Sequence, residues 1–236
     1  MKKLNPQKAI VLFSGGQDSS ISLAWAVDRY DDVTTIGFDY GQRHLVELEA
    51  RRSVREHIAV EFPEWRAKLG DDLLIDFSSF GRLGETAMTE NVPIEIGESD
   101  LPTTFVPGRN LAFLVFASAH AYKIGAGALI AGMCEADFSG YPDCREDVLA
   151  SQLTALRGGM DADFALETPL MHLTKAESWH LASTLGGDRL VRLIVEYSHT
   201  CYRGDRRRRF DWGYGCDDCP ACELRAKGWS AYKADL

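Results

Sequence analysis

The chain has 236 residues, of which 45% are hydrophobic and 26% charged, which is the composition of a globular protein with one substantial core. No apolar stretch reaches the roughly 20 residues of a membrane span, and the N-terminus lacks the apolar segment of a signal peptide. The formal net charge of -9 argues against a surface built to coat nucleic acid. We therefore expect a cytoplasmic protein that binds neither membrane nor nucleic acid.

Short β-rich runs alternate with helical patterns along most of the chain. In chain order the patterns predict strand 9–13, helix 21–27, strand 33–40, helix 44–58, strand 73–77, helix 111–124, strand 128–132, helix 146–156, strand 164–168 and helix 175–185. Residues 81–108 lack periodicity, and we expect them to cross over the active site. The alternation predicts an α/β fold with a doubly wound parallel sheet, spanning 1–195, with a C-terminal segment at 196–236 packed on it.

Polar residues lie at or just beyond the ends of four predicted strands, at Ser14, Asp39, Glu135 and Thr168. Ligands of parallel α/β sheets bind at the carboxyl ends of the strands. The sequence therefore predicts a site assembled from four separate stretches of the chain.

The stretch SGGQDSS, residues 14–20, lies between the first strand and the first helix. Glycines permit a sharp turn, and a helix start offers free N–H groups and a positive dipole end. The stretch lacks the lysine of a Walker loop and the spacing of a dinucleotide motif. Backbone N–H groups of 15–18, with the Ser14 and Ser19 hydroxyls, suit a pyrophosphate, and Asp18 suits a bridging Mg²⁺. The alternative is a plain helix N-cap turn.

This stretch resembles the pyrophosphate loop (PP-loop) of the N-type ATP pyrophosphatases, which adenylate a carbonyl oxygen. Over nearly the whole chain, further stretches are similar to the 7-cyano-7-deazaguanine synthase family: FDYGQRH (38–44), TFVPGRN (104–110), CEADFSGYPDCR (134–145), ETPLMHLTKAE (167–177), TCYRG (200–204) and CDDCPACELRAKG (216–228). The resemblance implies a homodimeric ATP-dependent C–N ligase of queuosine biosynthesis. Its substrates would be 7-carboxy-7-deazaguanine and ammonia, and its product the nitrile 7-cyano-7-deazaguanine (preQ0).

The resemblance implies that ATP binds along the first turn and helix and at the second strand end. The expected ATP ligands are Phe13, Ser14, Gly15, Gly16, Gln17, Asp18, Ser19, Ser20, Ile21, Ser22, Leu23 and Asp39. Negative charge develops on the phosphates in the transition state of adenylation, so we expect cations placed beside them beforehand. Lys175, which opens a helix after Thr174, and Arg109 are the candidates, and with Asp18 they form the expected catalytic set. Outside these motifs, each cation would more often be a surface charge.

The donor edge of a guanine-like ring suits carboxylates, and its faces suit aromatic rings. The expected substrate ligands are Gln42, Arg43, His44, Glu135, Asp137, Phe138, Tyr141 and Asp143. The alternatives are that the acids solvate a loop and that His44 only starts a helix.

The C-terminal region holds Cys216, Cys219 and Cys222 in a C-x2-C-x2-C run, and Cys201 makes a fourth thiol. Four thiolates suit tetrahedral zinc, although the tight run also resembles an iron–sulfur pattern. The family resemblance favours one zinc ion. Four protein ligands leave no open position, so we expect a structural zinc that clamps a tail too small for its own core.

Residues 203–214 between the first two of these cysteines look like an insertion relative to the family pattern. They contain four consecutive arginines, Arg206 to Arg209, which either line a solvated loop or contact substrate, a partner or RNA.

Two alternatives to the ligase stay open. One is a tRNA-thiolation enzyme that uses Cys134 and Cys144 as sulfur carriers, although buried inert thiols are commoner. The other is a nucleotide-binding regulatory module without catalysis. For the ligase we expect free ammonia, or ammonia from a separate protein, because the chain has no room for a glutaminase domain.

Overall fold

The computed structural model describes residues 1–41, 46–81, 86–88, 93–94, 101–135 and 141–236. Five parallel strands form one sheet in the order β3-β2-β1-β4-β5. The strands are β1 (Asn5–Leu12), β2 (Asp32–Asp39), β3 (Leu69–Asp76), β4 (Ala126–Ala131) and β5 (Ala165–Glu167). The predicted parallel sheet is confirmed. Its order reverses direction between β1 and β4, which is the switch point where such sheets bind ligands.

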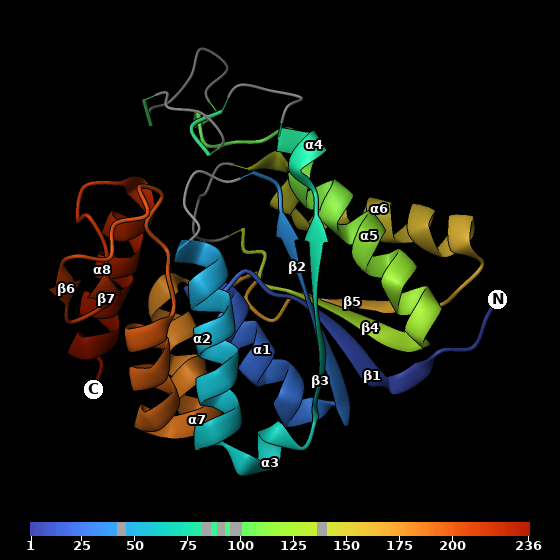
Figure 1. Ribbon diagram of the computed structural model, residues 1–236, viewed down its shortest axis with the longest axis horizontal. Coiled ribbons are helices and arrows are strands. Elements are labelled where there is room, and N and C mark those ends of the chain that lie inside the picture. Colours follow the sequence, from blue (N-terminus) through green and yellow to red (C-terminus); the bar gives the residue numbers. More distant parts are fainter. Residues whose placement is uncertain (42–45, 82–85, 89–92, 95–100, 136–140) are drawn as a thin grey trace.

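Helices cover the sheet on both faces (Figure 1). On one face lie α1 (Gln17–Arg29), α2 (Val46–Glu61) and α7 (Lys175–Tyr197), and on the other α5 (Arg109–Ile124) and α6 (Glu146–Met160). Short helices are α3 (Pro63–Arg66), α4 (Ser78–Gly81) and the 3-10 turn η1 (Pro142–Cys144). Within the described residues, no helix has the length and apolar character that crossing a membrane requires.

Alternating residues of β1 explain why its sequence reads as a continuous apolar run. Ala9 and Val11 face the cluster beneath α1 and α7, whereas Ile10 faces the cluster beneath α5. All three side chains have no exposed surface. A strand that is buried on both faces has apolar residues at successive positions, so the first strand was predictable from its composition.

The third strand begins at Leu69, earlier than the predicted start at residue 73. The acids Asp71 and Asp72 interrupt the apolar pattern there. The strand forms despite them because it is an edge strand, and Asp72 accepts a hydrogen bond from Arg51 Nη1 at 2.7 Å. A charge that is compensated by a distant helix cannot be recognised from the local pattern.

Helix α7 runs past the predicted end at residue 185, with a kink at Gly187, whose φ of 63° lies in the left-handed region. The predicted helix therefore corresponds to the part before the kink. The helix ends at Tyr197 and so crosses the predicted boundary between 1–195 and 196–236, and the division into two parts stays a prediction.

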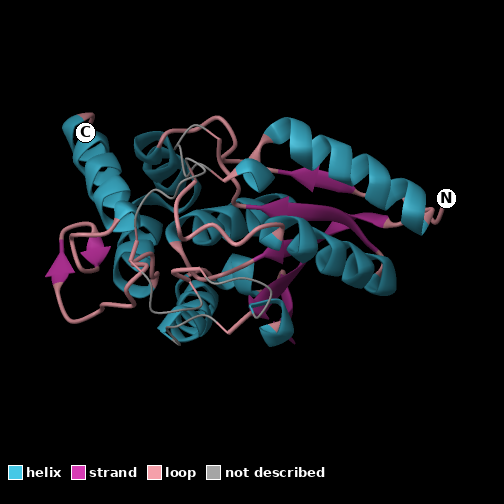
Figure 2. Ribbon diagram, turned by 90° about the horizontal axis from the view of Figure 1, so that it is seen from above, coloured by secondary structure: helices cyan, strands magenta, loops and turns pink. Residues whose placement is uncertain are grey.

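The C-terminal segment forms the hairpin β6 (Arg209–Phe210) and β7 (Gly213–Tyr214), followed by α8 (Pro220–Ala234), which the sequence patterns did not predict. It lies at the end of the molecule opposite the N-terminus (Figure 2). Arg225 of α8 is fully buried and donates to the Trp212 carbonyl at 2.9 Å and the Ile194 carbonyl at 3.2 Å. These bonds tie the hairpin and α8 to α7.

The four consecutive arginines of the insertion, Arg206 to Arg209, all have partners within the chain. Arg206 Nη1 donates to the Ser198 carbonyl at 3.2 Å, at the end of α7 where a cation opposes the negative end of the helix dipole. Arg207 pairs with Asp205, Arg208 lies over the Phe210 ring, and Arg209 pairs with Glu196. Each arginine of the run thus contacts a residue of the same chain.

Replacing Arg206 by alanine is expected to lower the free energy of unfolding by about 1–2 kcal/mol, because the last carbonyls of α7 lose a charged donor. The matched control is Arg207→Ala, which removes an exposed arginine from the same run and is expected to leave stability unchanged. Urea unfolding midpoints provide the comparison. Equal midpoints for the two variants would contradict a capping role for Arg206.

Candidate active site

Strand β1 leads into α1 through a tight turn at residues 13–16. Gly15 has a φ of 86°, and a Cβ at this position would lie 2.4 Å from the Arg51 backbone nitrogen, so only glycine fits. The Ser19 hydroxyl accepts from the Gly15 N–H at 3.1 Å and donates to the Gly16 carbonyl at 3.2 Å. The Gly15 N–H is thus used within the turn. The first N–H groups of α1 have no partner inside the helix, and such groups at a helix start can bind an anion.

A charged pair joins this turn to α7. Lys175 Nζ donates to the two carboxylate oxygens of Asp18 at 2.9 and 2.8 Å. A capping box fixes the start of α7: Thr174 Oγ1 accepts from the Glu177 N–H, and Glu177 Oε2 accepts from the Thr174 N–H at 2.8 Å. The lysine that the turn lacks is therefore supplied by a distant helix, and two of the three predicted catalytic residues lie in contact.

Helix α8 packs directly on this lysine. A Cβ at Gly228 would lie 2.3 Å from the Lys175 Cβ, so the glycine allows the approach. Lys175 is only 8% exposed. The position of the C-terminal segment therefore restricts where the lysine can lie.

A cavity of about 350 Å³ opens at the carboxyl edge of the sheet. It brings together predicted residues from the first turn and helix, α5, α7 and the stretch before η1. These are Phe13, Ser14, Gly16, Gln17, Asp18, Ser19, Arg109, Tyr141 and Lys175.

Other predicted ligands do not line this cavity. They are Gly15, Ser20, Ile21, Ser22, Leu23, Asp39, Glu135 and Asp143. The four side chains at positions 20–23 have no exposed surface, because α1 is buried between the sheet and α7. Gln42, Arg43, His44, Asp137 and Phe138 lie outside the described residues.

Two of the predicted acids accept hydrogen bonds at helix starts. Asp143 Oδ2 accepts from the Asn110 N–H in the first turn of α5 at 3.0 Å, and its Oδ1 accepts from Asn110 Nδ2 at 3.0 Å. Glu135 Oε2 lies 3.4 Å from the Glu146 nitrogen, the first residue of α6. Both carboxylates lie at positive helix ends, where negative charge is stabilising.

Several cavity residues were not predicted from the sequence. Tyr40 follows β2 and its hydroxyl lies 3.4 Å from Arg109 Nη1, while the Arg109 guanidinium lies 5.4 Å from the centre of the Tyr40 ring. Tyr202 Oη lies 3.4 Å from Tyr141 Oη. Glu47 faces the cavity from α2, where burial raises its pKa to about 7 against the opposing effect of Arg109. Only Tyr40 carried a signal, its place at a predicted strand end.

A further unpredicted residue, Arg51, lies buried beneath the turn. Its Nε donates to the Phe13 carbonyl at 2.8 Å, and its guanidinium pairs with Asp72 of β3. A Cβ at Gly37 of β2 would lie 2.4 Å from Arg51 Nε, so this strand glycine provides the space. Arg51 of α2 thus binds the turn, Asp72 of β3 fixes Arg51, and Gly37 of β2 leaves room for it.

The two cysteines at the cavity both form hydrogen bonds within the chain. Burial raises the pKa of Cys144 to about 12, so its sulfur remains a thiol, and it accepts a hydrogen bond from Asn110 Nδ2 at 3.2 Å. Cys134 Sγ donates to the Leu173 carbonyl at 3.3 Å. The tRNA-thiolation alternative is not favoured.

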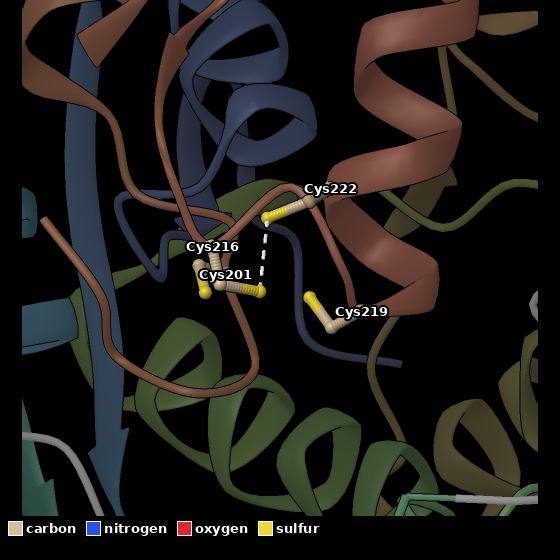
Figure 3. Close-up of side chains that lie close together, drawn as sticks. All are labelled: Cys201, Cys216, Cys219 and Cys222. Atoms are coloured by element: carbon tan, nitrogen blue, oxygen red, sulfur yellow. Dashed lines mark hydrogen bonds between the residues drawn. The ribbon is translucent and has the colours of Figure 1, made fainter. Parts of the chain in front are cut away.

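The four C-terminal cysteines converge on one point (Figure 3). Their sulfurs all lie within 4.8 Å of one another, and Cys201, Cys219 and Cys222 are buried. The Cys216 and Cys222 sulfurs are 4.0 Å apart. Zinc bound tetrahedrally to thiolates separates the sulfurs by about 3.8 Å. The predicted ligand set therefore fits a four-thiolate metal site, at the junction of α7, the hairpin and α8.

The parallel sheet and the glycine turn at its switch point define a PP-loop fold. A solved structure described as a 4-thiouridine synthetase–RNA complex with bound ATP shares this fold, with a TM-score of 0.52 and 16% identity. The match covers 96% of this chain and 53% of that one.

Within this class, residues 8–233 match the family described as Queuosine biosynthesis protein QueC, and the chain belongs to that family. Relatives named 7-cyano-7-deazaguanine synthase are 58% identical in Caulobacter vibrioides (strain NA1000 / CB15N), covering 94% of this chain and 92% of the relative. The same name and identity apply in Parvibaculum lavamentivorans (strain DS-1 / DSM 13023 / NCIMB 13966), covering 96% of each chain. The predicted family resemblance is confirmed.

Proposed function

We propose that this chain is an ATP-dependent ligase that converts 7-carboxy-7-deazaguanine and ammonia to 7-cyano-7-deazaguanine in queuosine biosynthesis. Family membership over nearly the full chain is the observation that carries this assignment. The glycine turn, the contact between Lys175 and Asp18 and the adjoining cavity support the proposal.

A carboxylate does not react with ammonia until one of its oxygens becomes a leaving group. In the first step, a carboxylate oxygen attacks the α-phosphorus of ATP, the bond to the β-phosphate oxygen breaks, and pyrophosphate leaves. The start of α1 binds the departing phosphates through its N–H groups. Lys175, paired with Asp18 before ATP binds, supplies positive charge beside them.

Ammonia then attacks the acyl carbon and displaces AMP, which leaves an amide after loss of a proton. A second activation makes the amide oxygen a leaving group, and its departure with the remaining nitrogen-bound protons gives the nitrile. Both activations use the same turn and the same cavity, and holding the two reactants in line supplies much of the rate.

Two metals belong to the proposal. Mg²⁺ is usually held by one or two carboxylates plus phosphate oxygens, and Asp18, whose side chain is 33% exposed beside the turn, fits that role. Bound Mg²⁺ would neutralise phosphate charge. One zinc ion at Cys201, Cys216, Cys219 and Cys222 would be structural, because four thiolates complete its coordination.

For partners and location, the proposal is a cytoplasmic homodimer that does not bind nucleic acid. The net charge of -9 and the internal partners of the arginine run support the absence of a nucleic-acid surface. The homodimer rests on the family resemblance.

With ATP, 7-carboxy-7-deazaguanine and ammonium as the only nitrogen source, we expect mass spectrometry to detect the nitrile, because the amine nucleophile is free ammonia. The control omits ammonium and should accumulate no nitrile. Absence of nitrile at every ammonium concentration, with the purified chain folded, would refute the use of free ammonia. Pyrophosphate release in the same assay separates the ligase from a non-catalytic nucleotide-binding module.

A further inference from the structure

The cavity contains a carboxylate that the described residues leave without a donor. Glu47 lies in the first turn of α2 and lines the cavity, partly buried. Among the residues that the structure describes, its carboxylate forms neither a hydrogen bond nor an ion pair. Withdrawing a carboxylate from water without donors costs free energy. The arrangement therefore indicates that a ligand supplies the donors.

The same cavity contains a cation with donors to spare. The Nη1 of Arg109 approaches Tyr40 Oη only at 3.4 Å, and its buried Nε lacks a partner within the described segments. The carboxylate of Asp143 already accepts two hydrogen bonds from Asn110. Among the described residues, no ion pair joins Arg109 to Glu47. An acidic and a basic side chain thus line one cavity, and the described residues show no direct ion pair between them.

The walls beside this pair are aromatic. Phe38 and Phe113 stack with ring centres 4.1 Å apart, and the Tyr40 ring lies 5.9 Å from that of Phe113. All three line the cavity. Aromatic walls with a few separated polar groups are typical of a site for a flat heterocycle whose edge is read by hydrogen bonds.

We propose that Glu47 and Arg109 together recognise the edge of the guanine-type ring of the substrate, an inference that rests on the proposed function. The ring's N1–H and 2-amino group are adjacent donors, which match the two oxygens of the Glu47 carboxylate. The carbonyl oxygen at C6 and the carboxylate at C7 lie on the neighbouring side, where both accept from the Arg109 guanidinium.

This pairing selects against an adenine-type ring. Such a ring presents an acceptor at N1 to the Glu47 carboxylate and an amino donor at C6 to the Arg109 guanidinium. The Glu47 carboxylate then faces another acceptor and the Arg109 guanidinium faces another donor, so neither forms a hydrogen bond and the ring binds weakly. Asp143 and Glu135, which the sequence suggested for this role, are used at helix starts.

The test compares two bases on two variants. In the parent chain, 7-carboxy-7-deazahypoxanthine, which lacks the 2-amino group, is expected to have a kcat/KM about 100-fold below that of 7-carboxy-7-deazaguanine. Glu47→Gln should raise the KM for the guanine-type base about 100-fold, with kcat and the KM for ATP within about threefold of the parent. In that variant the difference between the two bases should shrink to about threefold, which a merely structural role would not cause.

The matched control is Glu49→Gln, which changes an exposed glutamate in the same helical turn and should alter neither KM nor base preference. If Glu47→Gln does not fold, Glu47→Asp keeps the charge with a shorter reach and should raise the same KM. Unchanged KM and preference in the folded Glu47 variant would overturn the inference and leave the proposed function intact. A parent chain that forms no nitrile would instead overturn the proposed function, and equilibrium binding of the two bases would then decide whether Glu47 recognises the ring.

Discussion

Replacing Lys175 by alanine is expected to lower kcat about a thousandfold, the upper range for removing one preorganised charged donor from a transition state. The ammonium group lies within hydrogen-bonding distance of Asp18 at the turn, so it is in place before the phosphates gain negative charge. Pyrophosphate release in a single turnover measures this step without the later ones. The KM for ATP is expected to change less than kcat, because the turn and α1 still bind the phosphates.

The control for this prediction is Lys227→Ala, which removes an exposed lysine from α8 next to the glycine that packs on Lys175. It should leave turnover unchanged. Because Lys175 and Asp18 are a partly buried pair, removing one partner alone also destabilises the fold. The neutral pair Asp18→Asn with Lys175→Met should recover stability but not activity. Recovery of activity in that double variant would show that the pair only holds the structure.

The sheet and the glycine turn at residues 13–16 were predictable because their signals are local. A strand buried on both faces is apolar throughout, and the glycines of the turn are required by a backbone contact, as Gly15 against Arg51 shows. The cysteine quartet was predictable for a similar reason, since three ligands fall in one short run and metal coordination constrains their spacing.

The residues that the sequence did not reveal depend on contacts between distant segments. Glu47 and Arg51 are charged residues in an amphipathic helix, and nothing local separates them from exposed neighbours such as Glu49. Conversely, Glu135 and Asp143 lie in a stretch that suggested base recognition, yet each accepts a backbone N–H at the start of a helix. A carboxylate can serve either role, and only the position of the next helix decides which.

Replacing Cys219 by serine is expected to lower the melting temperature by about 10 °C, because a closed metal site contributes its binding free energy to folding. Cys219 is buried and immediately precedes α8, so its loss frees that helix from the junction with α7. Thermal unfolding and metal content are measured together, and zinc should fall from about one ion per chain to nearly none. Iron in the parent chain would identify the alternative cluster.

The control is Cys134→Ser, which changes a thiol outside the cluster. Its zinc content and melting temperature should equal those of the parent. A chelator should lower the melting temperature of the parent but not that of Cys219→Ser. If Cys219→Ser melts at the same temperature as the parent, the zinc is not structural. The same loss should reduce kcat in the folded variant, because Gly228 of α8 packs against Lys175 and a displaced α8 lets the lysine leave Asp18. The metal site would thus support catalysis through the position of one side chain.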